Sequence, residues 1–360
     1  MPPTLNSRVF NTVDDSGHSG PSSGWSFGSG AGGMVSGFAI CGCCGRLVSD
    51  GATDGHQGVI VNIDNRGSFG PNGKPSLSTT DAGLQITRGN QSWVTTGQPL
   101  GTPATVTFAF RASATTMPTD TAGFTQFTAI QIAATLLALR SWSDVANIVF
   151  QRVDDGAGYS DNASILFGNY SSGQSGAAAF AYGPGAPATG SVSGDVWVNS
   201  TFSYNANPAM LGYGQQVLTH EIGHALGLRH PADYNASEGV SITYQNDATY
   251  FEDSRQYTLM SYFSETNTGG AFLGSYSSAP LLDDISAAQR LYGANMTTRT
   301  GDTVYGFNSN TGLAWYAPGA QDRMIFAVWD AGGVDTLDFS GYAGPQTIDL
   351  RQGHFSSVVG

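Results

Sequence analysis

Apolar and polar residues alternate over residues 84–88 and 104–110, and this period of two predicts a half-buried strand in each segment. Short apolar runs at 163–168 and 195–199 predict two more strands. Residues 124–147 instead carry apolar side chains at helical spacing, which predicts one long helix that covers a sheet. Strands that flank such a helix are typical of an α+β fold with a twisted mixed sheet.

Two further helices are predicted in the second half of the chain. Residues 213–226 form the first, and residues 280–292 form the second, which Gly293 ends. Asp283 and Asp284 lie in the first turn of the second helix, where capping and the helix dipole are sufficient reasons for acidic residues. We therefore assign these two carboxylates no catalytic role.

The first of these helices carries the sequence HEIGHALGLRHP, which begins at His220. His220 and His224 lie one helical turn apart, so both imidazoles can reach one metal ion. Gly227 can adopt the left-handed conformation that stops a helix, so the chain can return and supply His230 as a third ligand. Three neutral histidines leave one position of a zinc ion open to water, which is the catalytic arrangement. Glu221 lies about 100° further around the helix and can act on that water as a general base.

The alternative for this segment is a polar helix whose histidines are merely solvated. Three of the six histidines of the chain fall within eleven residues, which argues against that alternative. The extended pattern HExxHxxGxxH, followed downstream by Met-Ser-Tyr at 260–262, resembles the metzincin signature and, within it, the serralysin branch. The resemblance implies that Met260 packs beneath the histidines. It also implies that Tyr262 is a mobile zinc ligand that donates to the oxyanion, whereas a plain core tyrosine is the alternative.

The resemblance covers residues 59–360 and implies three parts of the chain. They are a flexible leader or propeptide at 1–58, a zinc metalloprotease catalytic domain at 59–296, and the start of an RTX-type β-roll at 297–360. The leader is also expected from its Gly- and Ser-rich composition, which lacks sustained periodicity. The tandem glycine–aspartate repeats of the family are missing, so we expect a truncated roll and a fragment of a longer protein.

Turns rich in glycine and aspartate suggest calcium in this last part. Glycine lets carbonyl oxygens turn toward a hard cation, and aspartate supplies charged oxygens. The resemblance assigns one calcium ion to six ligands. Four are the carbonyl oxygens of Arg299, Gly301, Thr303 and Gly332, and two are the carboxylates of Asp330 and Asp335. Gly333 is a candidate for a neighbouring ion. Acidic turns without an ion are the alternative.

The segment 177–182 is rich in alanine, and the resemblance places it at the edge of the sheet, facing the cleft. An unpaired edge can bind an extended peptide as an additional strand, and small side chains would let a substrate backbone approach closely. An ordinary edge strand without a partner is an equal alternative.

Cys41, Cys43 and Cys44 are the only cysteines, and so tight a cluster cannot be a disulfide framework for a domain of this size. One hypothesis is latency, in which a leader thiolate occupies the open zinc position before processing. A redox-sensitive patch or a local metal scavenger in the leader are the other hypotheses.

Charge and length narrow the class of partner. The net charge of −13 and a single lysine, Lys74, argue against a nucleic acid as partner. No apolar run reaches the length of a membrane span, and no secretory signal of the usual kind opens the chain. The resemblance implies a secreted protein whose export signal lies in a C-terminus outside this chain, and we expect a monomer.

The function expected from these residues is zinc-dependent endopeptide hydrolysis of extended protein substrates. One alternative is a secreted calcium-binding adhesive or surface-layer protein on an inactive protease scaffold, and another is a metal-binding module without catalysis. The adhesive protein would be indicated by a lost base or ligand, and the metal-binding module by a protein ligand that permanently closes the fourth zinc position. The intact Glu221 and the three histidines favour the enzyme.

Overall fold

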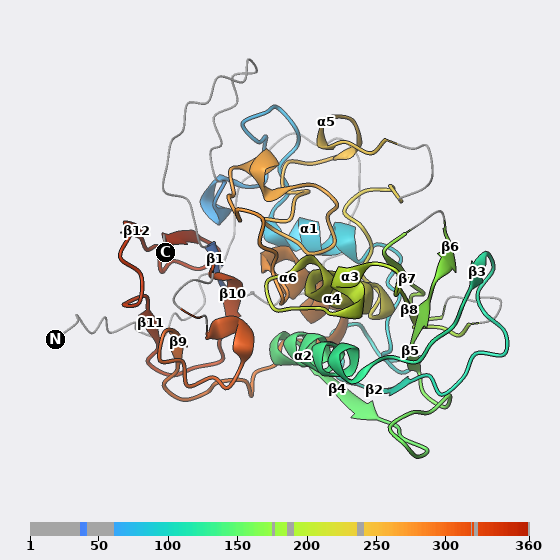
Figure 1. Cartoon of the computed structure of the whole chain (residues 1–360). Coiled ribbons are helices and arrows are strands. Elements are labelled where there is room, and N and C mark those ends of the chain that lie inside the picture. Colours follow the sequence, from blue (N-terminus) through green and yellow to red (C-terminus); the bar gives the residue numbers. More distant parts are fainter. Residues whose placement is uncertain are drawn as a thin grey trace.

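The structure of the chain is a computed structural model that describes the backbone of residues 37–41 and residues 61–174, 177–185, 191–235, 241–317, 319 and 323–358. The predictions about the three cysteine side chains lie outside the described residues. The elements fall into a helix-covered sheet and a separate group of C-terminal strands (Figure 1). No helix in the described ranges is long and apolar enough to cross a membrane.

A five-stranded mixed sheet lies at the centre of the first part, in the order β4-β2-β5-β8-β7. Four strands are parallel, and β7 pairs with β8 in the antiparallel direction at one edge. The strands are β2 (Ala104–Phe110), β4 (Ile148–Arg152), β5 (Ile165–Tyr170), β7 (Ala179–Ala181) and β8 (Val196–Asn199). The predicted strands at 104–110, 163–168 and 195–199 and the α+β fold class are confirmed.

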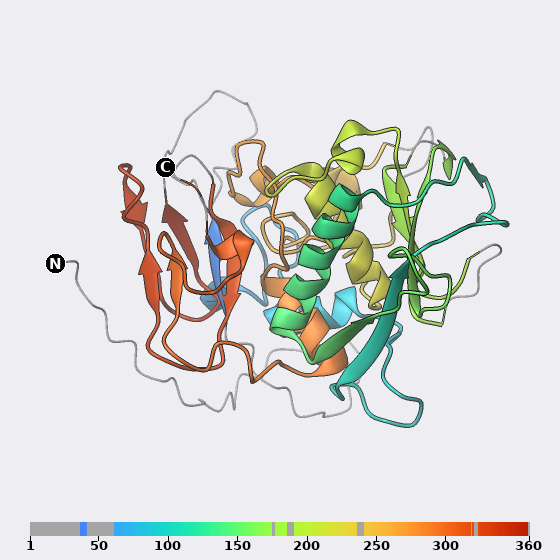
Figure 2. The same ribbon diagram turned by 60° about the horizontal axis from the view of Figure 1, so that its bottom comes forward.

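Helix α2 (Ala129–Val145) covers one face of this sheet (Figure 2). The predicted helix over 124–147 is confirmed, but it begins later. Thr128 caps it and exchanges two hydrogen bonds with Gln131, while Thr125 is still bridged to β5 in extended backbone. Trp142 of α2 is wholly buried, and its indole N–H donates to the carbonyl of Thr219, 3.0 Å away, which fixes the helix that carries the histidines.

The predicted strand over 84–88 is wrong, because these residues belong mostly to helix α1 (Thr79–Ile86). Ser78 caps α1 by accepting from the backbone N–H of Asp81. Ala82 and Ile86 are one helical turn apart and both fully buried. The helix packs closely on α6 (Leu282–Tyr292), since a Cβ at Gly83 would lie 2.6 Å from Ser286 Oγ. The five alternating apolar and polar residues fit one side of a helix as well as a strand, and tertiary packing selects the helix.

The histidine-bearing helix is α4 (Tyr213–Ala225), and both it and α6 match the predicted helices. The remaining helical turns are short. They are α3 (Ser203–Ala206), α5 (Tyr244–Asp247), and the 3-10 turns η1 (Ile63–Asn65), η3 (Glu265–Thr268) and η4 (Ala314–Tyr316). A two-stranded pair, β3 (Thr121–Ala122) with β6 (Ser172–Gly173), lies beside the main sheet.

The C-terminal strands form their own sheets around a second aromatic core that contains Tyr305, Tyr316 and Phe326. One sheet has the order β10-β1-β13-β12, and β11 pairs in parallel with β9. The strands are β9 (Val304–Gly306), β10 (Ile325–Trp329), β11 (Thr336–Asp338), β12 (Gln346–Thr347) and β13 (Phe355–Val358). Strand β1 (Gly37–Cys41), from the predicted leader, lies between β10 and β13. The parallel β9–β11 pair lies within the segment for which the start of a β-roll is predicted.

Candidate metal centre

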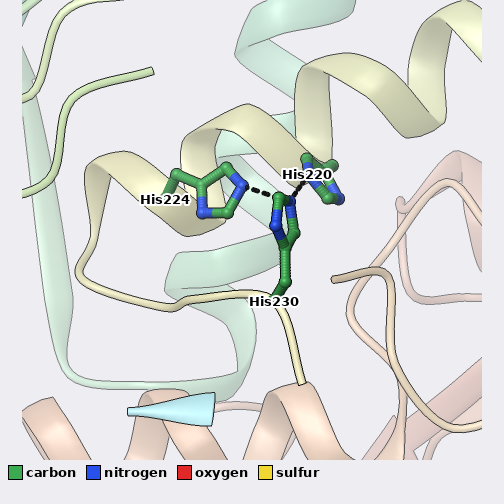
Figure 3. A group of neighbouring side chains, drawn as sticks. All are labelled: His220, His224 and His230. Carbon is green, nitrogen blue, oxygen red and sulfur yellow. Dashed lines mark hydrogen bonds between the residues drawn. The ribbon is translucent and has the colours of Figure 1, made fainter. Parts of the chain in front are cut away.

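The three histidines of the sequence motif converge on one point (Figure 3). The helix α4 presents His220 and His224, and His230 returns from the loop beyond it. The Nε2 atom of His230 lies 3.0 Å from that of His224 and 3.4 Å from that of His220. Three ring nitrogens this close together can share one ion, and in the described part of the chain they are the only such group of histidine, cysteine or carboxylate ligands.

Gly227 makes the return of the chain possible, as the sequence predicts. Its φ of 101° is the left-handed conformation, and a Cβ there would lie 2.0 Å from the carbonyl oxygen of Gln91. The backbone N–H of Leu228 donates to the carbonyl of Gly223, which ties the reversed chain to the last turn of α4.

Each histidine is oriented by a backbone carbonyl that lies 2.8 Å from its Nδ1 atom. The partners of His220, His224 and His230 are the carbonyls of Leu259, Leu228 and Tyr234, respectively. Each Nδ1 must therefore carry the proton, which leaves the lone pair of Nε2 for a metal. Burial lowers the pKa of His220 to about 4 and that of His230 to about 3, and it also lowers the pKa of His224 well below its usual value of 6.5. All three are neutral at pH 7 and ready to bind.

These lowered pKa values predict how the stability of the metal-free chain depends on pH. The unfolded histidines take up protons below about pH 6.5 whereas the folded ones stay neutral, so stability falls as the pH falls from 6.5 toward 4. Each histidine contributes about 1.4 kcal/mol per pH unit in this window. Urea unfolding of the chelator-treated proteins at pH 5 and pH 6 measures how steeply the free energy of unfolding falls with pH. In His230→Gln this slope should be about 1.4 kcal/mol per pH unit smaller than in the unsubstituted chain. An equal slope in the two proteins would contradict the predicted ionisation.

Glu221 lies beside His220 on α4 and lines the same cleft. Its side chain is 6% exposed, and burial raises its pKa to about 8. The Oε2 atom accepts no hydrogen bond from any described residue. A buried carboxyl with a vacant acceptor atom beside the metal ligands has the placement that a proton-transfer group needs.

The Met-turn lies against the histidine-bearing helix. Met260 is wholly buried, and a Cβ at Gly223 would lie 2.7 Å from its sulfur, so the thioether fills the space beside a glycine directly next to His224. Met260 is predicted to lie beneath the three histidines, and the contact observed is with Gly223 of the helix that carries two of them. Asp284 holds the turn by accepting from the backbone N–H of Leu259, 2.8 Å away, and from the hydroxyl of Thr258. It thus does more than the capping role that the sequence suggested.

Tyr262 reaches the centre from the far end of the same turn. Its ring centroid lies 4.4 Å from that of His230 and 6.2 Å from that of His220. The structure therefore brings Tyr262 together with the predicted ligands.

An open cleft of about 760 Å³ runs past this centre, between α4 and strand β7. Ala179, Phe180 and Ala181 of β7 line it, together with the histidines, Glu221 and Tyr262. Within the predicted segment 177–182, residues 179–181 thus form an edge strand of the sheet that faces the cleft.

The predicted calcium turns also come together in the C-terminal part. A Cβ at Gly333 would lie 2.5 Å from the carbonyl oxygen of Gly301, and Asp335 accepts from the backbone N–H of Thr303, 3.0 Å away. Asp330 accepts from the N–H of Gly332 and from the hydroxyl of Tyr305. Burial and the neighbouring Asp330 raise the pKa of Asp335 to about 6. The side chain of Arg299 donates to Asp144, and its carbonyl oxygen is the atom that could face an ion.

Sequence reasoning missed the residues that support the ligands. Tyr234 stacks on His230 with ring centroids 5.3 Å apart, and the buried Asp253 accepts from the Tyr234 hydroxyl, 2.8 Å away. Neither residue belongs to the motif or recurs at a spacing that would single it out. The only available signal was a run of acidic and hydroxyl side chains, Glu252-Asp253-Ser254, just before the Met-turn.

Comparison with known proteins places this centre in a family. Residues 105–272 match a family model described as Metallo-peptidase family M12, and residues 294–360 match Peptidase M10 serralysin C terminal. Serralysin A of Dickeya chrysanthemi is 52% identical over 292 residues, which are 80% of this chain and 59% of that protein. Metallopeptidase AprA of Pseudomonas marginalis is 48% identical over 306 residues, which are 82% of this chain and 62% of that protein.

The matches cover both the catalytic and the C-terminal parts that the sequence predicts. The chain spans about three fifths of the length of these relatives. On both family models and on the identity of about half of the aligned residues, the chain belongs to the serralysin family of metallopeptidases.

Proposed function

We propose that this chain is a zinc-dependent endopeptidase. The observation that carries the proposal is the convergence of three Nε2 lone pairs beside the buried, unpaired Oε2 of Glu221. Three neutral imidazoles suit zinc and leave one of its positions for water or substrate. Orphaned acceptor atoms of this kind are costly in a folded protein unless a ligand or a reaction uses them.

Zinc held by His220, His224 and His230 would polarise the scissile carbonyl and lower the pKa of a water molecule. Glu221 accepts the proton of that water as it attacks the carbonyl carbon, and then passes the proton to the leaving amide nitrogen. We assign Tyr262 two roles, as a zinc ligand in the resting site and as a hydroxyl donor to the carbonyl oxygen when that oxygen becomes negative. Its position beside His230 supports both.

The products of casein digestion test the reaction class. An endopeptidase should release internal fragments that mass spectrometry identifies, and a zinc chelator should stop their formation. Release of single residues from a chain end would contradict endopeptidase activity. An absence of cleavage would favour the alternative of an adhesive protein on an inactive scaffold, which the complete set of Glu221 and three histidines does not support.

We further propose that substrate pairs with the free edge of β7. The carbonyl of Ala178 accepts from the N–H of Asn199 in β8, and the N–H of Tyr182 donates to the carbonyl of Asp195 just before β8. In an antiparallel ladder the backbone groups of Ala179 and Ala181 therefore point away from β8. Those groups line the cleft and can bond to an extended peptide, while neither side chain is large enough to obstruct it.

A proline at Ala181 tests this pairing, because it removes one outward N–H and no bond to β8. We expect Ala181→Pro to lower kcat/KM for a long peptide by up to about tenfold, the value of one lost backbone bond. The matched variant Ala181→Ser keeps the N–H and a small side chain, and it should stay within about threefold of the unsubstituted chain. Equal rates for the proline and serine variants would contradict strand addition.

Calcium binding by the C-terminal turns is a separate proposal. We assign one ion to the carbonyls of Arg299, Gly301, Thr303 and Gly332 and the carboxylates of Asp330 and Asp335, with Gly333 beside a second ion. The raised pKa of Asp335 beside Asp330 supports it, since a cation would relieve that repulsion.

Calcium should therefore raise the Tm of the unsubstituted chain, because it binds only the folded form. The variant Asp335→Asn should lose most of that rise, whereas the exposed Asp154→Asn should keep it. Equal shifts of Tm in the two variants would contradict this assignment.

Secretion, a monomeric state and a propeptide at 1–58 are further proposals that rest on the family resemblance.

A further inference from the structure

Three consecutive polar side chains, Glu252, Asp253 and Ser254, are wholly buried just before the Met-turn. Burying such groups is costly unless each one is hydrogen-bonded. Each of them contacts a different segment of the chain. Glu252 accepts hydrogen bonds from Ser76 and Leu77, and Asp253 accepts from Tyr234 and Ser261. The hydroxyl of Ser254 shares a hydrogen bond with that of Thr268.

Asp253 is the member of this group that reaches the metal centre. Its Oδ1 atom accepts two hydrogen bonds, from the hydroxyl of Tyr234 at 2.8 Å and from the hydroxyl of Ser261 at 2.7 Å. Tyr234 lies four residues after His230, and Ser261 directly precedes Tyr262. A single oxygen atom therefore joins the loop of the third histidine to the Met-turn.

Tyr234 fixes His230 in two ways. Its carbonyl oxygen lies 2.8 Å from the Nδ1 atom of His230, and its ring is nearly parallel to the imidazole, with centroids 5.3 Å apart. The hydrogen bond from the Tyr234 hydroxyl to Asp253 restrains the far end of this ring. The same residue, through its ring and its carbonyl, orients the third histidine.

Ser261 fixes the other side of the centre. Its hydroxyl donates to Asp253 and accepts from the backbone N–H of Phe263, 3.1 Å away, so both neighbours of Tyr262 are held. The ring of Tyr262 lies 5.1 Å from that of Tyr234 and 4.4 Å from that of His230. Any displacement of Ser261 would be passed to Tyr262.

We propose that Asp253 is a positioning residue that couples the third zinc ligand to Tyr262. The inference rests on the proposed zinc binding by His220, His224 and His230. Without the carboxylate, Tyr234 loses its anchor, so His230 binds less firmly and zinc leaves faster. Ser261 loses its anchor at the same time, so Tyr262 adopts its catalytic position less often.

The rate of zinc release to a chelator tests the first consequence without any assay of activity. In the full chain, we expect Asp253→Ala to release zinc several-fold faster, up to about tenfold, because Asp253 restrains His230 only through Tyr234, and removing a ligand's own hydrogen-bond partner costs about tenfold or more. Asp253→Asn keeps the shape and one acceptor oxygen and should show a smaller increase. The visible spectrum of the cobalt-substituted chain should change in the alanine variant, because it reports the ligand geometry. Ser254→Ala, equally buried but outside the centre, should release zinc at the unsubstituted rate.

Two single-hydroxyl variants keep the test valid if Asp253→Ala does not fold. Tyr234→Phe should release zinc faster, whereas Ser261→Ala should retain zinc and lower kcat with little change in KM. In the Asp253→Ala background, where that protein folds, neither substitution should add more than about twofold, because both act through the same carboxylate.

Zinc release by Asp253→Ala or by Tyr234→Phe within twofold of the unsubstituted chain would overturn the proposal. The outcome is separable from that of the proposed function. A chain that holds zinc but cleaves no protein would contradict only the endopeptidase, because zinc release and the cobalt spectrum need no substrate.

Discussion

Replacing Glu221 with glutamine should reduce peptide hydrolysis by about 10²- to 10⁴-fold while the chain still binds one zinc ion. Glutamine has the same shape but cannot accept the proton of the attacking water. The three histidines each keep their own carbonyl partner, so the metal site does not depend on the Glu221 side chain. The rate with a fluorogenic peptide and the zinc content of the same sample measure both effects.

A matched glutamate provides the control. Glu265 is similarly buried, but it accepts from the backbone N–H of Phe272 in a loop that contributes nothing to the metal centre. Glu265→Gln should keep a rate within about threefold of the unsubstituted chain. Retention of more than about a tenth of the rate by Glu221→Gln would show that another group moves the proton.

Replacing Arg66 with methionine should lower the free energy of unfolding by about 3–5 kcal/mol. The side chain of Arg66 is buried, and its two Nη atoms bond to the two carboxylate oxygens of Asp283, 2.8 Å and 2.9 Å away. Its Nε atom donates to the carbonyl of Leu77 and lies 3.7 Å from Glu252. Removing the guanidinium leaves two carboxylates buried without their cation, which is far costlier than losing a surface ion pair.

Urea unfolding measures this change, and two further variants interpret it. Arg152→Met removes an exposed arginine of β4 and should cost less than about 1 kcal/mol. The triple variant Arg66→Met, Glu252→Gln and Asp283→Asn leaves no buried charge behind and should regain part of the loss. A cost of less than about 1 kcal/mol for Arg66→Met alone would contradict the view that this triad holds residues 61–79 onto α6.

Much of the fold could be predicted where local pattern and tertiary demand agree. Helix α4 and strand β2 have the predicted bounds to within one residue, since each has a clear period and a buried face. The segment 84–88 shows the limit of such reasoning. Five alternating residues fit a strand or one side of a helix equally well, and only the packing of α1 on α6 decides between them.

The metal ligands could be predicted because they lie within eleven residues at spacings that a helix and a turn impose. Their supports could not, because these contacts link residues far apart in sequence. The carbonyl of Leu259 that orients His220 is 39 residues away, and the carboxylate of Asp284 that holds Leu259 is 25 residues further. Such partners follow from the path of the chain, for which a single sequence has no local signal.

The pairing of β1 with β10 and β13 was likewise beyond prediction, because a glycine-rich segment carries no period that indicates a strand. It places five residues of the predicted leader in the C-terminal sheet. The boundary proposed at residue 58 therefore does not separate two structural units, because residues on both sides of it belong to one sheet.

Titration of the metal-free chain with zinc, followed by the rate of peptide hydrolysis, tests the central claim most directly. Three histidines that share one ion predict a rate that rises in proportion to added zinc and stops rising at one equivalent per chain. Hydrolysis by the metal-free chain, or one tightly bound equivalent of zinc that produces no hydrolysis, would contradict the account.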